Sequence, residues 1–215
     1  MKTAHQAWRF VAPATVAGAL GLWLARRPGS QACGALLAFL AFGFALFTLY
    51  FFRDPERPLP TDASKLYSPG DGVVLSVARE GPGDVVTLRI FLSVFNVHIQ
   101  RAPCAGKVAK IQVVEGSFAA AMKDSARYNA RVVMSIEPGA GRGILVVEQI
   151  VGLIARRIEC WPKVGELVAA GQRYGIIYFG SQAAVHFPAG AKCTAQVGDK
   201  MVAGVTEIGT WTSTA

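Results

Sequence analysis

Charged residues are scarce in this chain: they make up 17% of its 215 residues, against about 25% in an average soluble protein. Its four cysteines are spread singly, with no C-x-x-C pair and no His–Cys spacing typical of zinc. We therefore expect neither a disulfide framework nor a bound metal. Cys33 lies in an apolar run, and Cys104, Cys160 and Cys193 are expected to be reduced thiols in the core.

The chain also lacks any basic run interleaved with aromatic residues and any nucleic-acid-binding motif. It is nevertheless basic, with a net charge of +8 and a pI near 9.6. Anionic membrane lipid is therefore the partner that its charge favours, and we expect no nucleic acid.

Apolar residues are in excess, at 52%, and they concentrate before residue 53. Residues 10–25 carry no charge, and neither do residues 32–52, a run as long as the ~20 residues that span a bilayer as a helix. We expect residues 1–52 to form a membrane-associated helical hairpin, with a signal peptide or two buried core helices as alternatives. Whether this hairpin spans the cell membrane or lies in one leaflet is left open. In either case we expect the remaining domain on the cytoplasmic face.

Residues 53–60 hold three prolines and four charges, which predict a hinge that ends the helix. From residue 61 to 215 the chain reads as short apolar runs separated by glycine turns, a pattern typical of strands. The strands are predicted at residues 72–77, 85–91, 106–114, 131–136, 143–150, 174–179, 183–187, 192–197 and 204–208. Only residues 117–127 and 151–157 look helical.

An internal repeat refines this fold. The segment 164–171 matches 197–204, each with glycines six residues apart around an acidic turn and an apolar patch. This resembles the quasi-symmetric sandwich of biotinyl and lipoyl carrier domains. The expected fold class is therefore mainly β, a carrier-like (barrel-sandwich hybrid) domain after an N-terminal hydrophobic helical hairpin.

The dipeptide Gly180-Ser181 stands inside an apolar, strand-like run, where glycine marks a bulge, a bend or a close backbone approach. A serine hydroxyl activated by a base could attack the carbonyl of Gly180 and convert the peptide bond to an ester. Elimination would then cut the chain, and hydrolysis of the resulting dehydroalanine would leave a pyruvoyl group at residue 181. The alternative is a glycine bulge followed by a solvent-facing serine.

A base for Ser181 must come from three histidines. His5 is expected in a solvated tail, and His186 would point to the opposite sheet face from Ser181 if the strand is regular. His98 is a polar residue in the long apolar run 90–103, which favours it as the base, although a hydrogen-bonded core histidine fits the same pattern. Asp71, in an Asp-Gly turn, is our candidate for the carboxylate that orients His98.

Five ordered motifs carry a resemblance to a known family. They are residues 52–57 (FRDPER), 68–72 (SPGDG), 91–98 (FLSVFNVH), 152–157 (GLIARR) and 179–181 (FGS). In this order they resemble the short bacterial and archaeal form of phosphatidylserine decarboxylase, from the apolar segment to beyond Ser181. The family usually has alanine where Gly70 stands here.

The resemblance implies a pyruvoyl enzyme cut between Gly180 and Ser181 into fragments 1–180 and 181–215, with Asp71, His98 and Ser181 as the maturation triad. The pyruvoyl carbonyl would form a Schiff base with the serine amine of phosphatidylserine and accept the electrons left by CO2, giving phosphatidylethanolamine. Such a sink usually comes from pyridoxal phosphate, but no lysine context for that cofactor is clear. His98 is the candidate proton donor, and Arg156 and Arg157 either pair with the lipid phosphate or form a solvated basic pair.

Two other functions fit parts of the pattern. A non-catalytic membrane-anchored adaptor with the same sandwich explains the hairpin and the repeat. It does not explain why Ser181 and His98 occur together. A serine hydrolase would need a Gly-x-Ser-x-Gly elbow, and Ala183 occupies its last position. The acyl-chain preference, a homo-oligomeric state and a different lipid-linked amino acid as substrate are left open.

Overall fold

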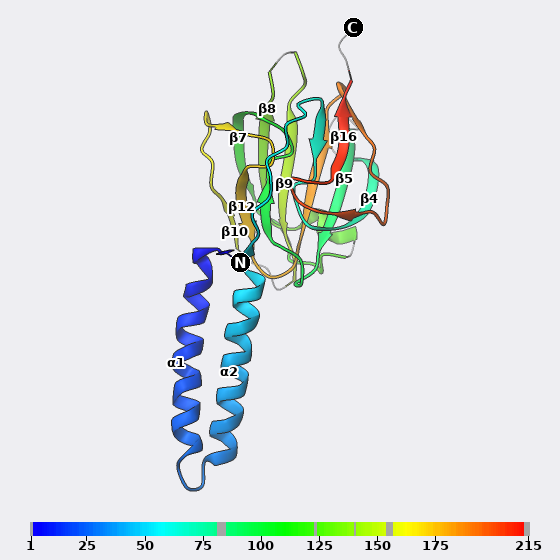
Figure 1. Ribbon diagram of the computed structural model, residues 1–215. Coiled ribbons are helices and arrows are strands. Elements are labelled where there is room, and N and C mark those ends of the chain that lie inside the picture. The colour runs from blue at the N-terminus through cyan, green and yellow to red at the C-terminus, as the bar shows by residue number, and fades with distance from the viewer. Residues whose placement is uncertain (1, 81–84, 123, 140, 154–156, 213–215) are drawn as a thin grey trace. The chain divides into compact units, whose positions relative to one another are not determined.

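A computed structural model describes residues 2–80, 85–122, 124–139, 141–153 and 157–212. The chain divides into two compact units, Met1–Glu56 and Arg57–Ala215. The division falls within the segment 53–60 that the prolines mark in the sequence. Figure 1 shows a helical hairpin in the first unit and a β domain in the second.

The first unit is built on two helices, α1 (Trp8–Ala25), entered through the short 3-10 turn η1 (His5–Ala7), and α2 (Gln31–Phe51). Glycines allow the helices to pack closely, since a Cβ added at Gly21 would lie 2.5 Å from the backbone nitrogen of Ala38. Large apolar side chains such as Phe39 remain exposed. Both helices are long and apolar enough to cross a membrane.

The ends of the hairpin are tied together. Strand β1 (Lys2–Thr3) pairs antiparallel with β2 (Arg53–Asp54), directly after α2. The ammonium group of Lys2 also lies 2.7 Å from the carboxylate of Glu56. The start of the chain is therefore anchored to the segment that leads out of the hairpin.

The second unit is built on one curled eight-stranded sheet, in the order β11-β7-β8-β9-β13-β5-β4-β15 (Figure 1). Every neighbouring pair in it is antiparallel. Its strands are β4 (Gly72–Glu80), β5 (Val85–Leu92), β7 (Gly106–Val114), β8 (Arg131–Glu137), β9 (Leu145–Val151), β11 (Leu167–Val168), β13 (Ser181–Phe187) and β15 (Lys200–Met201).

Two three-stranded sheets complete the domain, ordered β10-β12-β6 and β14-β16-β3. Their strands are β3 (Lys65–Tyr67), β6 (Ile99–Arg101), β10 (Ile158–Cys160), β12 (Arg173–Ile177), β14 (Ala191–Cys193) and β16 (Glu207–Trp211). The main core includes Leu88, Met134, Tyr174, Val185 and Trp211, contributed by all three sheets. The mainly β class and the helical hairpin predicted from the sequence are confirmed.

The internal repeat occupies matching places in the fold. Its two copies supply β11 and β15, the strands at opposite edges of the large sheet. Both glycines of each copy have positive φ: +94° at Gly165 and +73° at Gly171 in the first copy, and +91° at Gly198 and +69° at Gly204 in the second. A Cβ on Gly204 would lie 3.2 Å from the Cα of Gly171, so the two copies meet at their ends.

The helix predicted at residues 117–127 is wrong. The only regular element there among the described residues is a 3-10 turn, η2 (Asp124–Tyr128). The buried Asn129 side chain explains the difference: its Oδ1 accepts from Ser117 Oγ and Ala119 N, and its Nδ2 donates to the carbonyls of Ala119 and Val151. These four bonds hold the segment in an irregular loop against β9. In the other predicted helix, 151–157, Val151 ends β9 and residues 154–156 lie outside the described residues.

Candidate active site

Ser181 is the first residue of β13, in the middle of the large sheet. It pairs with Leu92 of β5 on one side and with Val151 of β9 on the other. Directly opposite residues share a sheet face, so Ser181 points to the core side with Leu92. Its Oγ is buried and has no hydrogen-bond partner within the described part of the chain. An unpaired buried hydroxyl is unusual and calls for a reason.

The backbone is strained just before Ser181. Phe179 has φ +55° and is the one non-glycine residue with positive φ among the described residues, and Gly180 follows with φ +80°. A left-handed conformation is costly for a residue with a Cβ and tends to occur at functional sites. The two residues turn the chain sharply, so the peptide bond between Gly180 and Ser181 lies at a bend before the strand.

His98 contacts this bend directly. The backbone N–H of Gly180 donates to Nε2 of His98 over 3.3 Å, and Nδ1 lies 3.1 Å from the carbonyl oxygen of Asn96. A backbone N–H can only donate and a carbonyl can only accept, so these bonds define a neutral imidazole with its proton on Nδ1. The Nε2 lone pair then accepts the N–H of the Phe179-Gly180 peptide, one residue before the Gly180-Ser181 bond. This is the tautomer that a base for Ser181 needs.

Asn96 fixes the segment that carries His98. Its Oδ1 accepts the backbone N–H of Ser93 at 2.9 Å, and its own N–H donates to the carbonyl of Ser93 at 2.9 Å. The carbonyl of Asn96 is therefore held in place where it meets His98. Our sequence reasoning missed this residue, although a Ser-x-x-Asn spacing before a strand is ordinary turn chemistry.

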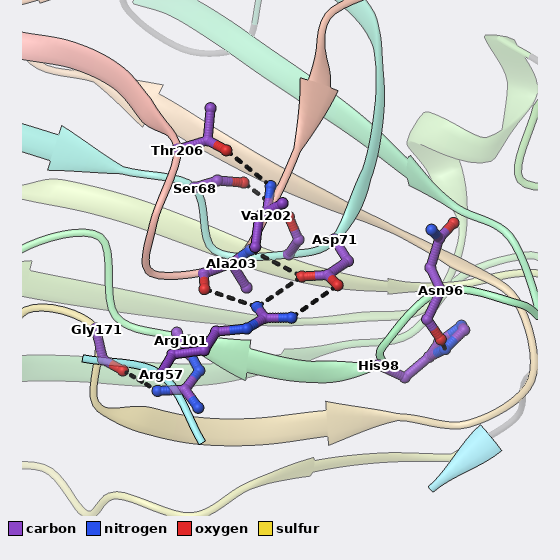
Figure 2. A network of polar contacts seen from close by, with 11 residues as sticks. Arg57, Ser68, Asp71, Asn96, His98, Arg101, Gly171, Val202, Ala203 and Thr206 are labelled. Carbon is purple, nitrogen blue, oxygen red and sulfur yellow. Dashed lines mark hydrogen bonds and ion pairs between the residues drawn. The ribbon is translucent and has the colours of Figure 1, made fainter. Parts of the chain in front are cut away.

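Asp71 is held by Arg57 rather than by His98 (Figure 2). The guanidinium nitrogens of Arg57 lie 2.7 and 2.9 Å from the two carboxylate oxygens, and the backbone N–H of Ala203 donates to Oδ1 at 2.8 Å. Arg57 also donates to the carbonyl of Ala203 at 2.7 Å. Both side chains are mostly buried. The structure thus joins Asp71 to Arg57 and His98 to Asn96, and the part of Asp71 in maturation stays a prediction.

Of the two candidate arginines, Arg156 lies outside the described residues. Arg157 is half-exposed, 3.2 Å from the Glu159 carboxylate, with its guanidinium carbon 5.6 Å from the centre of the Tyr178 ring. The hydroxyl of Tyr178 donates to the same carboxylate at 2.7 Å. Tyr178 precedes Gly180 by two residues, so Arg157 contacts a side chain next to the bend.

His186 lies on the opposite face of β13, as alternation predicts. Its Nδ1 is 2.9 Å from Thr87 Oγ1 and its Nε2 is 3.3 Å from the carboxylate of Glu148. Burial alone would raise the pKa of Glu148, but His186, Arg131 and Arg89 outweigh it and hold that pKa below its ordinary value of 4.5. His186 therefore belongs to a polar cluster on the outer face, away from the Oγ of Ser181.

Comparisons with known proteins agree with one another. A family model described as phosphatidylserine decarboxylase matches residues 44–209. A phosphatidylserine decarboxylase proenzyme of Symbiobacterium thermophilum is 42% identical over 212 residues, which cover 96% of this chain and 94% of that protein. Proteins of the same description are 41% identical over 180 residues in Desulfotalea psychrophila (81% of this chain, 84% of that protein) and 36% identical over 208 residues in Paraburkholderia phymatum (94% of each).

Proposed function

This chain belongs to the phosphatidylserine decarboxylase family, and on that premise we propose that it converts phosphatidylserine to phosphatidylethanolamine and CO2 with a pyruvoyl group made from Ser181. The observation that carries the proposal is the contact of His98 Nε2 with the amide of Gly180, beside an unpaired buried Ser181 hydroxyl. The proenzyme names of the relatives are consistent with a chain that is processed after synthesis.

Maturation begins when Nε2 of His98 takes the proton of Ser181 Oγ. The oxygen then bonds to the carbonyl carbon of Gly180, the C–N bond breaks, and the freed nitrogen of residue 181 takes up the proton. Loss of the Cα proton of residue 181 next expels the ester oxygen with Gly180 as a new carboxylate. The dehydroalanine left at residue 181 adds water and releases ammonia, which leaves a pyruvoyl group. The products are fragments 1–180 and 181–215.

The residues around Ser181 fit such a group, because the hydroxyl that would be consumed makes no hydrogen bond with the described residues that the fold would lose. The pyruvoyl carbonyl supplies the electron sink that loss of a carboxyl group requires. His98 is buried and its Nε2 contacts Gly180, the residue before 181, which supports its role as the donor of a proton to the carbon that loses CO2. Arg157, together with Arg156, provides positive charge for the lipid phosphate or for anionic headgroups.

The helical hairpin supports the proposal that the substrate is a membrane lipid. Two long apolar helices with exposed Leu and Phe side chains suit association with the cell membrane, and we place the β domain on its cytoplasmic face. The adaptor alternative is not favoured, since it gives no reason for strain at Phe179 and an unpaired serine next to a neutral histidine.

The test is the mass of the purified protein. We expect two species, residues 1–180 and residues 181–215, with the smaller one blocked to Edman sequencing until its carbonyl is converted to an amine by reductive amination. Ser181→Ala should stay whole and inactive, whereas Ser181→Cys should cut slowly through a thioester. Ser135→Ala, a strand serine of the same sheet, is the matched control and should cut normally. A wild-type protein that decarboxylates phosphatidylserine as one uncut chain would overturn the mechanism.

A further inference from the structure

Two buried glutamines have no hydrogen bond to the described part of the protein. Gln100 of β6 and Gln149 of β9 are 0% and 1% exposed, and the Nε2 and Oε1 atoms of both are unpaired. A side-chain amide offers two donors and an acceptor, so burying it unpaired costs stability that a leucine would not cost. Such groups are rare in folded proteins and point to water or a ligand.

The two amides lie on one side of the small sheet. Gln100 is the register partner of Gly175 in β12, so its side chain leaves the sheet on the face where a Cβ of Gly175 would point. That Cβ would lie 2.7 Å from Nε2 and 3.1 Å from Oε1 of Gln149. Both side chains therefore lie on the side of Gly175 to which its Cβ would point, between the small sheet and the large one, and glycine leaves room there.

Ser181 lies on the same sheet face as Gln149. Gln149 is the partner of Ala183, which follows Ser181 by two residues on the same face of β13. Such diagonal cross-strand neighbours lie about 7–8 Å apart, within reach of a long side chain. On the other side, a Cβ at Gly70 would lie 3.2 Å from Nε2 of Gln100 and 3.4 Å from the side chain of Leu92, the partner of Ser181 in β5.

These register and distance relations place Gln100 and Gln149 on the interior side of the two sheets that Ser181 also faces. We propose that Gln100 and Gln149 bind the carboxylate of the amino-acid headgroup that residue 181 acts on. This assignment rests on the proposed function and names the residues that select a carboxylate-bearing substrate. Cleavage makes Gly180 a chain end, so the bend before residue 181 is no longer bonded to it.

Neutral amides suit this task. The amine of the substrate must reach residue 181, and its carboxyl group lies two bonds from that nitrogen. The two Nε2 groups can donate to the carboxylate oxygens from buried positions. A lysine or arginine there would hold the charged carboxylate more tightly and oppose its conversion to uncharged CO2, because charge-assisted hydrogen bonds are the stronger kind.

The experiment measures binding without turnover. Short-chain phosphatidyl-3-hydroxypropionate keeps the carboxylate but lacks the amine, and phosphatidylpropanol lacks both. The mature wild-type protein should bind the first lipid more tightly than the second. Gln100→Leu and Gln149→Leu should each lose about tenfold of that preference, because a hydrogen bond to a charged group is worth about that factor. The thermal midpoint of both variants should stay equal or rise, since an unpaired amide has been removed.

Gln182→Leu is the control. Gln182 is a buried glutamine next to Ser181, but it points to the opposite face and donates to the carbonyl of Ala121, so the carboxylate preference should not change. Full preference in both leucine variants would overturn the inference and leave the amides with water alone. A fall in thermal midpoint with unchanged preference would overturn it as well, by showing a purely structural role. The mass of each variant reports cleavage at residue 181 separately, so a failure of maturation is not confused with a failure of carboxylate binding.

Discussion

The amide of Gly180 donates a hydrogen bond to Nε2 of His98 at 3.3 Å, across 82 positions of sequence. The bond places the lone pair of a buried, neutral imidazole against the peptide N–H that directly precedes the Gly180-Ser181 bond, which we expect to be cut. The base therefore lies one residue from that bond before any reaction takes place. The predictions about maturation follow from this pairing.

Replacing His98 with alanine should leave the precursor uncut. A positioned general base contributes about 10²–10⁴-fold to such a step, so cleavage should slow by that factor. Intact mass of freshly made protein, followed over time, measures it. His186→Ala should cut at the wild-type rate, because His186 lies on the other face of β13. Complete cleavage of the His98 variant would remove this residue from maturation.

Phe179 should matter through its backbone. Valine disfavours the left-handed region more than leucine does because it is branched at Cβ, whereas glycine adopts that region freely. We expect Phe179→Gly to cut, Phe179→Leu to cut at an intermediate rate, and Phe179→Val to cut slowest. The fraction cleaved after cell-free synthesis gives the order. Equal rates for valine and leucine would show that the φ of +55° has no part in the reaction.

Arg57 should stabilise the domain through Asp71. In Arg57→Met the mostly buried carboxylate loses its partner, and breaking a buried pair costs about 3 kcal/mol. Arg57→Lys should cost less, because lysine keeps the positive charge beside Asp71. Some cost should remain, because one ammonium group cannot reproduce both guanidinium bonds. Combining Arg57→Met with Asp71→Asn should recover stability without restoring cleavage. Thermal midpoints and intact masses of the four proteins test this, and a double variant that cuts normally would exclude Asp71 from maturation.

Acid should remove the contribution of Glu148. Its pKa lies below the ordinary value of 4.5 in the folded protein, so its ionised form stabilises the fold above that value. This stability is lost as the pH falls below 4.5 and through the lowered pKa. Wild type should therefore melt above Glu148→Gln at neutral pH, and the difference between their midpoints should shrink toward zero in acid. A constant difference across this range would contradict the stabilising contacts of the Glu148 carboxylate with His186 and Arg131.

Deleting residues 1–52 should move the protein toward the soluble fraction. The deletion removes α1 and α2, the two described helices that are long and apolar enough to cross a membrane. Fractionation with a carbonate wash gives the result, with the full-length chain as reference. Tight membrane association of the shortened protein would show that the hairpin is not the anchor.

Sequence patterns anticipated the parts of the fold that local physics dictates. Uncharged runs without a polar face predicted both helices to within two residues at each end, and glycine-bounded apolar runs predicted most strands. The repeat predicted two segments of similar structure, but not that their strands, β11 and β15, lie at opposite edges of one sheet. The helix at residues 117–127 failed because Asn129, outside the segment, takes its backbone bonds.

The candidate site was harder to predict for a related reason. Sequence alone indicated that His98 and Ser181 are polar residues in apolar runs, yet not that His98 contacts the amide of Gly180, the residue before Ser181. Nor does spacing decide whether the imidazole contacts Asp71 or the carbonyl of Asn96, since backbone acceptors leave no trace in residue identity. The positive φ of Phe179 is likewise a property of the folded chain. A phenylalanine at this position would by itself predict a negative φ.

Strand β13 runs between β5 and β9, and the strands after it, β14, β15 and β16, join two different sheets. After cleavage before Ser181, the strands of the short fragment would remain hydrogen-bonded to strands of the long one. Each copy of the protein would then keep, for its whole lifetime, the prosthetic group that it formed during maturation. A cell could not reload a spent copy from a pool of cofactor, as it can with a dissociable coenzyme, so chemical damage at residue 181 would be repaired only by synthesising a new chain.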